Sequence, residues 1–284
     1  MKIILVPCDF SQLAIDAYRY ALDIASQSKG VVHLLHVAEY PVGREPILTS
    51  IAEMEENLIQ DIHAKIAIEF DKITSLYFNE NVTVISEMEF GIPSKKILNY
   101  ILDHSIDLVV MGSHGTRGLH ELLIGSNAEK IVRTASVPVL VLKNYFQTPI
   151  KNIVFPNTFD IEFQEDLVVQ IMALQDFFNA QIHLLWINTP FNLISESVIH
   201  TKLKDFASHY SIKNYTTNVI SSRNEEGGIL NFAKSVGSDL IAMGTHGRKG
   251  IKHLLLGSVA EDVMNHSDIL IWTYALQNEL TNEN

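Results

Sequence analysis

The amino-acid sequence predicts two α/β domains in tandem, each a doubly wound parallel sheet with helices on both faces. Short aliphatic runs alternate with amphipathic helical segments, which is typical of βαβ units. The run Met111–Ser126 (MGSHGTRGLHELLIGS) returns as Met243–Ser258 (MGTHGRKGIKHLLLGS). Because the strand pattern also restarts at Asn152, the sequence indicates one fold repeated along the chain.

The first half provides five candidate strands with helical segments between them. A turn and Ser11, a candidate N-cap, precede the first helix. A loop with Pro41 and Pro46 leads into a long helix from about Ser50 to Phe78, and Pro93 starts another. The aliphatic runs that predict the strands are Lys2–Val6, Val31–Val37, Asn81–Phe90, Ile106–Met111 and Val137–Leu142.

The second half repeats this order after a short linker, Asn144–Lys151. We therefore expect domains at residues 1–145 and 148–284. The interval from Pro7 to Pro156 is 149 residues and that from Gly112 to Gly244 is 132, so the second half is 149 − 132 = 17 residues shorter between these landmarks. A shorter helix, Ser195–Tyr210, is expected to account for much of this difference.

Composition limits the classes of partner. The chain has 284 residues, 47% hydrophobic and 19% charged, which suits about two globular domains. Its 21 basic and 33 acidic residues give a net charge of −12, which argues against nucleic acid or a membrane surface as the main partner. We expect a cytoplasmic protein, because no apolar run has membrane-spanning length and the single Cys8 forms no internal disulfide.

The repeated glycines suggest a phosphate site. Each copy follows a strand with the spacing G-x2-G-x9-G-S: Gly112, Gly115, Gly125 and Ser126, then Gly244, Gly247, Gly257 and Ser258. Glycine permits positive φ and leaves no Cβ between main-chain N–H groups and an anion, and a helix N-terminus follows. A plainer interpretation is a loose loop with a capping box, since Ser126 and Ser258 each precede a glutamate, Glu129 or Glu261, by three residues.

This motif resembles the one that nucleotide-binding universal stress proteins carry after their fourth strand, and the resemblance extends over both halves. It implies a five-stranded order 3-2-1-4-5 in each half, with the ligand where strands 1 and 4 meet. It also implies ATP as ligand, with Mg²⁺ arriving on its phosphates. The residues carried over as candidate contacts are Asp9, Val37, Met111, Gly112, Gly115, Arg117, Gly125, Ser126 and Asn127, with Gly244, Gly247, Gly257 and Ser258 in the second half.

The two halves differ where the resemblance places adenosine. Asp9, which would hold the adenosine portion, aligns with Thr158, which has no carboxylate. The alternative is that Asp9 only completes its own turn. Val37, whose main chain would meet adenine, aligns with Ile187, and His36 with the bulkier Trp186, which alternation can direct to the other sheet face. We expect ATP in the first half rather than the second.

Other polar residues support weaker hypotheses. Arg117, Arg248 and Lys249 could neutralise phosphate, although exposed loop cations are usually only solvated. His114 and His246 are expected to pack within their loops, and no catalytic residue is identified. No metal site is expected, because His33 and His36 would point to opposite faces of a strand.

These observations favour a regulatory or protective nucleotide-binding module. The alternatives are a slow ATP hydrolase or phosphotransfer protein, and a nucleotide-free scaffold that binds an unidentified protein partner. The fifth strands, Val137–Leu142 and Ile269–Tyr274, carry no charge to protect an exposed edge. We therefore expect the halves to pack as an internal pseudo-dimer about these strands, with separate glycine loops.

Overall fold

The computed structural model describes residues 1–39, 49–115, 124–145, 149–159, 164–246 and 256–276; for 49–55, 246 and 256–258 it describes the main chain alone. The first half contains β1 (Ile3–Pro7), α1 (Gln12–Ser28), β2 (Val31–Ala38), α2 (Thr49–Leu76), β3 (Thr83–Phe90), α3 (Pro93–Asp103), β4 (Leu108–Gly112), α4 (Ser126–Thr134) and β5 (Val139–Leu142). The second half contains β6 (Asn152–Pro156), α5 (Glu165–Phe178), β7 (Gln181–Asn188), α6 (Glu196–His209), β8 (Tyr215–Ser221), α7 (Glu225–Ser235), β9 (Leu240–His246), α8 (Leu256–His266) and β10 (Leu270–Leu276). The predicted elements are all present, with boundaries that differ by a few residues.

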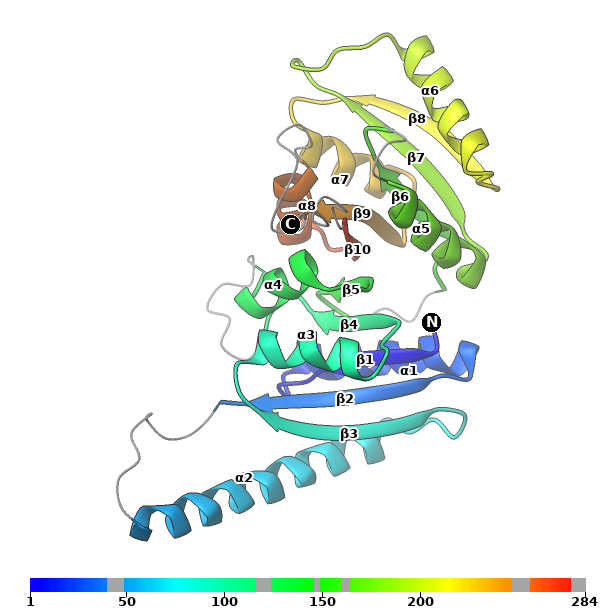
Figure 1. The fold of residues 1–284 in the computed structure, drawn as a ribbon. Helices are drawn as coiled ribbons and strands as arrows, with labels where there is room; N and C mark the ends of the chain where they lie inside the picture. Colours follow the sequence, from blue (N-terminus) through cyan, green and yellow to red (C-terminus); the bar gives the residue numbers. More distant parts are fainter. Residues whose placement is uncertain (40–48, 116–123, 146–148, 160–163, 247–255, 277–284) are drawn as a thin grey trace, which may run out of the picture.

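The strands form one ten-stranded sheet in the order β3-β2-β1-β4-β5-β10-β9-β6-β7-β8. Each half contributes five strands in the order 3-2-1-4-5, and its strands run parallel. This confirms the predicted fold class of two tandem doubly wound units. Figure 1 shows the two halves above and below the junction of β5 and β10.

The two halves meet through an antiparallel strand pair. Val139, Leu140 and Val141 of β5 lie opposite Thr273, Trp272 and Ile271 of β10. All of β5 is buried, and the Trp272 side chain is fully enclosed. The apolar edge that each five-stranded sheet would otherwise expose is therefore covered by the other half.

The core lies in two layers, one on each face of the sheet. Alternate residues of a strand point to opposite faces, so Leu34 packs in the layer under α1, α2, α5 and α6, whereas Leu35 packs in the layer under α3, α4, α7 and α8. Strands buried on both faces explain the continuous aliphatic runs in the sequence.

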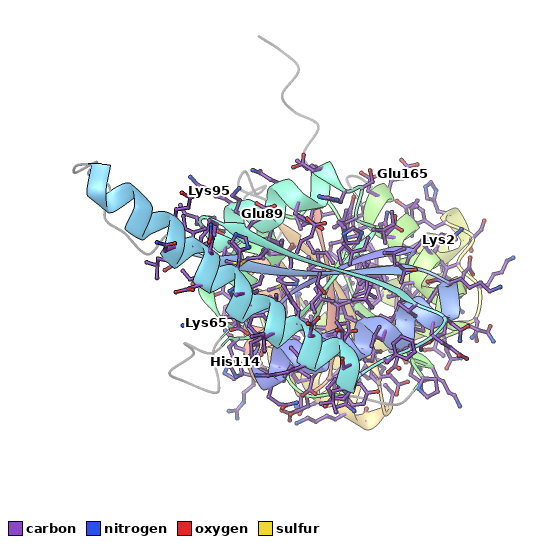
Figure 2. All side chains as sticks on the ribbon, turned by 90° about the horizontal axis from the view of Figure 1, so that it is seen from below. Lys2, Lys65, Glu89, Lys95, His114 and Glu165 are labelled. Atoms are coloured by element: carbon purple, nitrogen blue, oxygen red, sulfur yellow. The ribbon has the colours of Figure 1, made fainter. Side chains whose placement is uncertain are left out.

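The largest difference between the halves is the helix after the second strand. α2 has 28 residues and α6 has 14, which accounts for most of the predicted 17-residue difference. α2 packs against β3 at the outer end of the first half, as Figure 2 shows from below.

Helix α4 is completed by a residue of the other half. The Val132 carbonyl lies in the last turn of α4, where carbonyls lack partners within the helix, and the buried Thr245 hydroxyl donates a hydrogen bond of 2.9 Å to it. At the surface, Arg133 pairs with Glu261 of α8. The junction thus combines strand pairing with side-chain contacts on one face.

We expect Thr245→Val to lower the free energy of unfolding by about 1–3 kcal/mol, because it leaves the buried Val132 carbonyl unpaired. Glu261→Gln, which removes the half-exposed Arg133 ion pair, is the matched control and should cost less than about 1 kcal/mol. Urea denaturation of both variants measures the difference. Equal losses would show that the threonine bond does not stabilise the junction.

Candidate functional site

The site predicted for a ligand lies where β1 and β4 pair at the centre of the first half. Ile4 lies beside Leu108 and Leu5 beside Val109. β1 leads towards α1 on one face and β4 leads towards α4 on the other, so the chain diverges beyond the two strand ends. This is the topological switch point at which doubly wound sheets bind ligands.

The turn after β1 directs Asp9 towards the glycine loop. One Asp9 oxygen accepts the Ser11 N–H at 3.1 Å, and the Ser11 hydroxyl accepts the Ala14 N–H as N-cap of α1. Between them Phe10 has a left-handed conformation, φ 64°. The turn role considered as the alternative for Asp9 is therefore present, but it involves only one of the two oxygens.

The other Asp9 oxygen lies against Gly115. A Cβ at position 115 would collide with Asp9 Oδ2, so the carboxylate fills the space that any side chain there would need. Glycine at position 115 permits this close approach. The contact brings the end of β1 to the loop that follows β4, although the two residues are 106 positions apart in the chain.

Gly112 also permits a close approach, and neither it nor Gly115 uses the positive φ that glycine allows. A Cβ at Gly112 would lie 2.8 Å from the Leu13 Cβ of α1. Among the described residues, the glycines with positive φ are Gly91 and Gly237. The first two glycines of the motif thus permit close packing of α1 and of Asp9 against the strand end, without a left-handed backbone.

The described ends of the first glycine loop are held by three hydrogen bonds from main-chain N–H groups. Ser113 N–H donates to Leu142 at 2.9 Å, and Gly125 N–H donates to Ser113 at 2.7 Å. Ile124 N–H donates to the Asn265 side chain of α8 at 2.8 Å. Because the Gly125 N–H is used to close the loop, it is not the donor that the sequence suggested for a phosphate.

Donors without a partner among the described residues lie one residue further on, at the start of α4. Gly125 is the N-cap, without a side-chain cap, and its carbonyl accepts the Glu129 N–H. The N–H groups of Ser126, Asn127 and Ala128 therefore have no partner within the helix and can meet an anion. Ser126 and Asn127 are exposed, which leaves this helix end accessible.

The capping boxes predicted for both helices are wrong. Ser126 is the first helical residue rather than the cap, and Glu129 pairs with Arg133 at 3.2 Å. In the second half α8 starts at Leu256, so Gly257 and Ser258 are already helical. The four-residue capping spacing is present in the sequence, but its serine is already helical in both halves.

The main chain of Val37 faces the space beyond the end of β1. The Leu35 carbonyl accepts the Cys8 N–H, and alternate residues of a parallel strand direct N–H and C=O to the same side. β1 ends opposite Leu35, so Val37 has no strand partner on that side, and no described residue bonds its N–H or C=O there. Within the described part of the chain, both groups thus lack a partner on the side that faces the predicted site.

In the second half the corresponding carbonyl is already occupied. Asn157 N–H donates to Leu185, as Cys8 does to Leu35, so Ile187 corresponds to Val37. The Asn192 side chain donates a hydrogen bond of 3.4 Å to the Ile187 carbonyl. The chain itself supplies the partner that a ligand would supply in the first half.

The turn after β6 repeats the first-half geometry without its carboxylate. Phe159 is left-handed, φ 57°, like Phe10. The Thr158 hydroxyl, which corresponds to the Asp9 carboxylate, is buried and has no hydrogen-bond partner among the described residues. Phe159 stacks on Trp186 with ring centroids 6.3 Å apart. Trp186 and Ile187 lie on opposite faces, as alternation predicted.

The structure separates the two histidines considered for a metal. His36 Nδ1 is 2.7 Å from the Cys8 carbonyl, and its ring lies beside Phe10. His33 Nδ1 is 2.8 Å from the Tyr100 hydroxyl on the other face. The two rings therefore lie on opposite faces of the sheet, as strand alternation predicted.

The remaining candidates fall into three groups. Met111 is buried in the α4 layer, so only its main chain can meet a ligand, and Gly244 is packed against Leu167. His114 Nδ1 lies 3.0 Å from the Ser113 hydroxyl, in agreement with a packing role. Arg117, Gly247, Arg248, Lys249 and the His246 side chain lie outside the described residues.

Sequence similarity to known proteins extends over both halves of the chain. The model of the universal stress protein family matches residues 1–143 and 193–273. Universal stress protein MJ0531 of Methanocaldococcus jannaschii is 30% identical over 143 residues, half of this chain and 82% of that protein. Universal stress protein Slr1230 of Synechocystis is 24% identical to this chain. The match covers 96% of this chain and all of Slr1230.

A similar structure is that of a universal stress protein from Archaeoglobus fulgidus, with TM-score 0.69, 15% identity, and 97% and 98% of the two chains covered. This likeness shows the fold.

The fold and the motif together define a class of protein: a tandem doubly wound protein with a glycine loop at its switch point. The chain belongs to the universal stress protein family. No helix in the described part of the chain is long and apolar enough to span a membrane.

We expect Cys8 to resist alkylation in the native protein. Burial, opposed by a hydrogen bond from the Phe10 main chain and reinforced by the charge of Asp9, raises the pKa of its thiol to about 12. At pH 8 only about one thiol in ten thousand is then the reactive thiolate. Iodoacetamide followed by mass spectrometry should modify the urea-unfolded chain and leave the native chain unmodified. Rapid native labelling would contradict the buried placement beside Asp9.

Proposed function

We propose that the first half binds ATP at the switch point between β1 and β4, and that the protein acts as a regulatory or protective module of the stress response. The observation that carries the proposal is the contact of Asp9 with Gly115, which assembles a carboxylate, a loop and a helix N-terminus at one strand edge. The universal stress protein family membership supports it.

In this proposal the groups divide along the nucleotide. Asp9 accepts hydrogen bonds from the ribose hydroxyls, and the Val37 N–H and C=O bind the adenine edge. The N–H groups at the start of α4 bind phosphate, and Arg117 with a Mg²⁺ ion carried by the nucleotide balances its charge. Met111 and Gly112 contribute main chain only.

The second half is proposed to bind nucleotide weakly or not at all. Thr158 supplies no carboxylate, and Asn192 already occupies the Ile187 carbonyl. In this proposal its glycine motif, Gly244 to Ser258, does not suffice for nucleotide binding. The halves then act as an internal pseudo-dimer of domains 1–145 and 148–284, and only the first carries a complete site.

The other hypotheses receive less support. Hydrolysis or phosphotransfer needs a residue that positions the attacking oxygen. We identify no such residue among the described side chains at this strand edge. A nucleotide-free scaffold does not explain why Gly115 leaves room for Asp9. We keep the cytoplasm as the proposed location and an unidentified protein as the partner, with no role for nucleic acid or membrane.

Protein purified without added nucleotide tests the proposal by mass spectrometry and ATP titration. We expect one adenine nucleotide per chain. Asp9→Ala should weaken ATP binding at least about tenfold, because a charged hydrogen-bond acceptor is lost. The matched control is Thr158→Ala, which should change neither affinity nor stoichiometry. Two equal sites, or an Asp9→Ala variant with unchanged affinity, would contradict the assignment.

Gly125→Val tests the helix end separately. A Cβ at position 125 would lie 3.4 Å from the His114 Cα, so the alanine variant is tolerated locally, whereas the branched valine presses on the loop and on the phosphate position. We expect ATP binding to be lost in Gly125→Val while the thermal unfolding curve remains cooperative. Normal ATP affinity in this variant would exclude the start of α4 as the phosphate site.

A further inference from the structure

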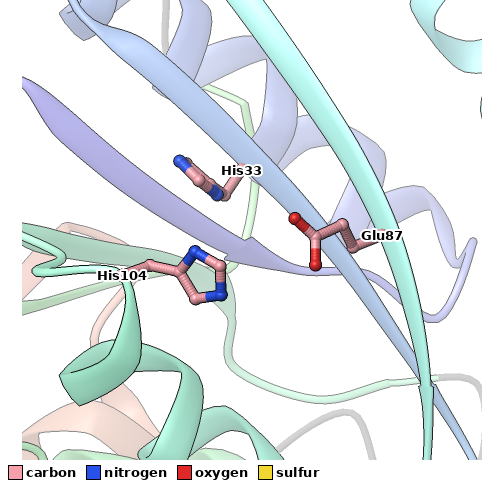
Figure 3. Close-up of side chains that lie close together, drawn as sticks. All are labelled: His33, Glu87 and His104. Atoms are coloured by element: carbon pink, nitrogen blue, oxygen red, sulfur yellow. The ribbon is translucent and has the colours of Figure 1, made fainter.

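Three side chains that can bind a metal meet on the α3 face of the first half. They are His33 of β2, Glu87 of β3 and His104, which directly follows α3. One ligand atom from each lies within 4.8 Å of the other two. Figure 3 shows the Glu87 carboxylate directed towards the two imidazole rings.

Strand register and helix length build this cluster. β2 and β3 pair with Leu35 opposite Glu87, so the side chains of His33 and Glu87 point to the same face, two residues apart along the sheet. α3 packs on that face and ends at Asp103. His104, its C-cap, therefore completes the group.

Tyr100 holds the three side chains in place. Its hydroxyl lies 2.8 Å from His33 Nδ1, and burial together with a hydrogen bond to Glu87 raises the pKa of the tyrosine. Its ring stacks on that of His104, with centroids 3.8 Å apart. His33 is buried, whereas Glu87 and His104 are half-buried, so the cluster has an ordered inner part and an accessible side.

We propose that His33, Glu87 and His104 form a binding site for a divalent transition metal, with Zn²⁺ the ion that the donor set favours. Two imidazoles and one carboxylate suit zinc and its neighbours rather than Mg²⁺ or Ca²⁺, which prefer oxygen ligands. With three protein ligands the fourth position is left to water or to the Tyr100 oxygen.

Small side-chain movements complete the geometry. Ligand atoms on one tetrahedral Zn²⁺ lie roughly 3.3 Å apart, so the cluster has to contract by at most roughly 1.5 Å. Glu87 and His104 have the freedom to move, because each is partly exposed. An ion bound to His33 Nδ1 takes the place of the hydrogen bond between that nitrogen and the Tyr100 hydroxyl. The hydroxyl itself stays beside Glu87.

The second half has the same fold at this place without the ligands. His183 corresponds to His33, but its two nitrogens lie 2.8 Å from Thr216 and 3.4 Å from Asn152. Asn218 lies opposite Leu185 as Glu87 does opposite Leu35. Val236 and Phe232 take the places of His104 and Tyr100 around the end of α7. A buried histidine at this position is therefore found in both halves and does not by itself indicate a metal site. The other two ligands, Glu87 and His104, occur only in the first half.

The proposed ion does not depend on the nucleotide. His33 and Val37 lie four residues apart on β2, about 13 Å along the strand, and the cluster faces α3 at the opposite end from the glycine loop. A metal here would tie the edge strand β3 to the end of α3. Its binding is therefore expected to stabilise the first half.

Isothermal titration of the chelator-treated, nucleotide-free full chain with Zn²⁺ tests the site, together with melting curves with and without Zn²⁺. We expect one cluster-dependent Zn²⁺ per chain and a rise in melting temperature. His104→Val and Glu87→Asn introduce the residues that the second half carries at these positions. Each should weaken binding at least about tenfold and abolish the Zn²⁺-dependent rise.

His209→Val, at an exposed histidine of α6, is the matched control and should change neither measurement. Asp9→Ala should also bind Zn²⁺ normally, which separates this proposal from the nucleotide site. Equal Zn²⁺ affinity in the wild type and in both cluster variants would overturn the proposal. Saturation by Mg²⁺ in place of Zn²⁺ would overturn it as well.

Discussion

The antiparallel pairing of β5 with β10 is the constraint on which the arrangement of the whole chain depends. Three residue pairs, centred on Leu140 and Trp272, join two five-stranded sheets into one. Each strand would be an unprotected apolar edge on its own. The short connection between the halves keeps the second edge at high effective concentration, so the halves cover each other within one chain.

Comparison of the halves separates residues required by the fold from residues required by a site. Asp107 and Asp239 both bind two consecutive N–H groups at the start of the first strand of their half, and both halves keep a left-handed phenylalanine after that strand. These repeats fix the turns. The halves differ at three positions where ligands are proposed: Asp9 against Thr158, Glu87 against Asn218, and His104 against Val236.

Periodicity and repetition predicted the strands, the helices and the duplication, and the family resemblance supplied the strand order. Strand-length aliphatic runs, the repeated glycine motif and the family resemblance gave the ten strands and their order. The role of individual atoms could not be predicted in the same way. The sequence indicated only that these glycines permit positive φ or a close approach. The structure shows the close approach, of Leu13 to Gly112 and of Asp9 to Gly115, which depends on packing between distant segments.

The contacts missed from the sequence share one cause. The Thr245–Val132 and Ile124–Asn265 bonds cross the junction of the halves, and His33, Glu87 and His104 meet only through a particular strand register and helix length. No local spacing signals these groups. His33 was considered with His36 because the two are close in sequence, whereas its partners lie 54 and 71 residues away.

The junction also bears on the nucleotide site. Asn265 of α8 accepts the Ile124 N–H at the end of the first glycine loop, and its main-chain carbonyl accepts a hydrogen bond from Lys143, just beyond β5. One residue of the second half therefore anchors both the loop and the strand next to the proposed phosphate position. A first half expressed alone would lose this anchor and expose β5. Its ATP affinity would then reflect the missing support as well as its own contacts, so the two sites are best compared by substitutions in the intact chain.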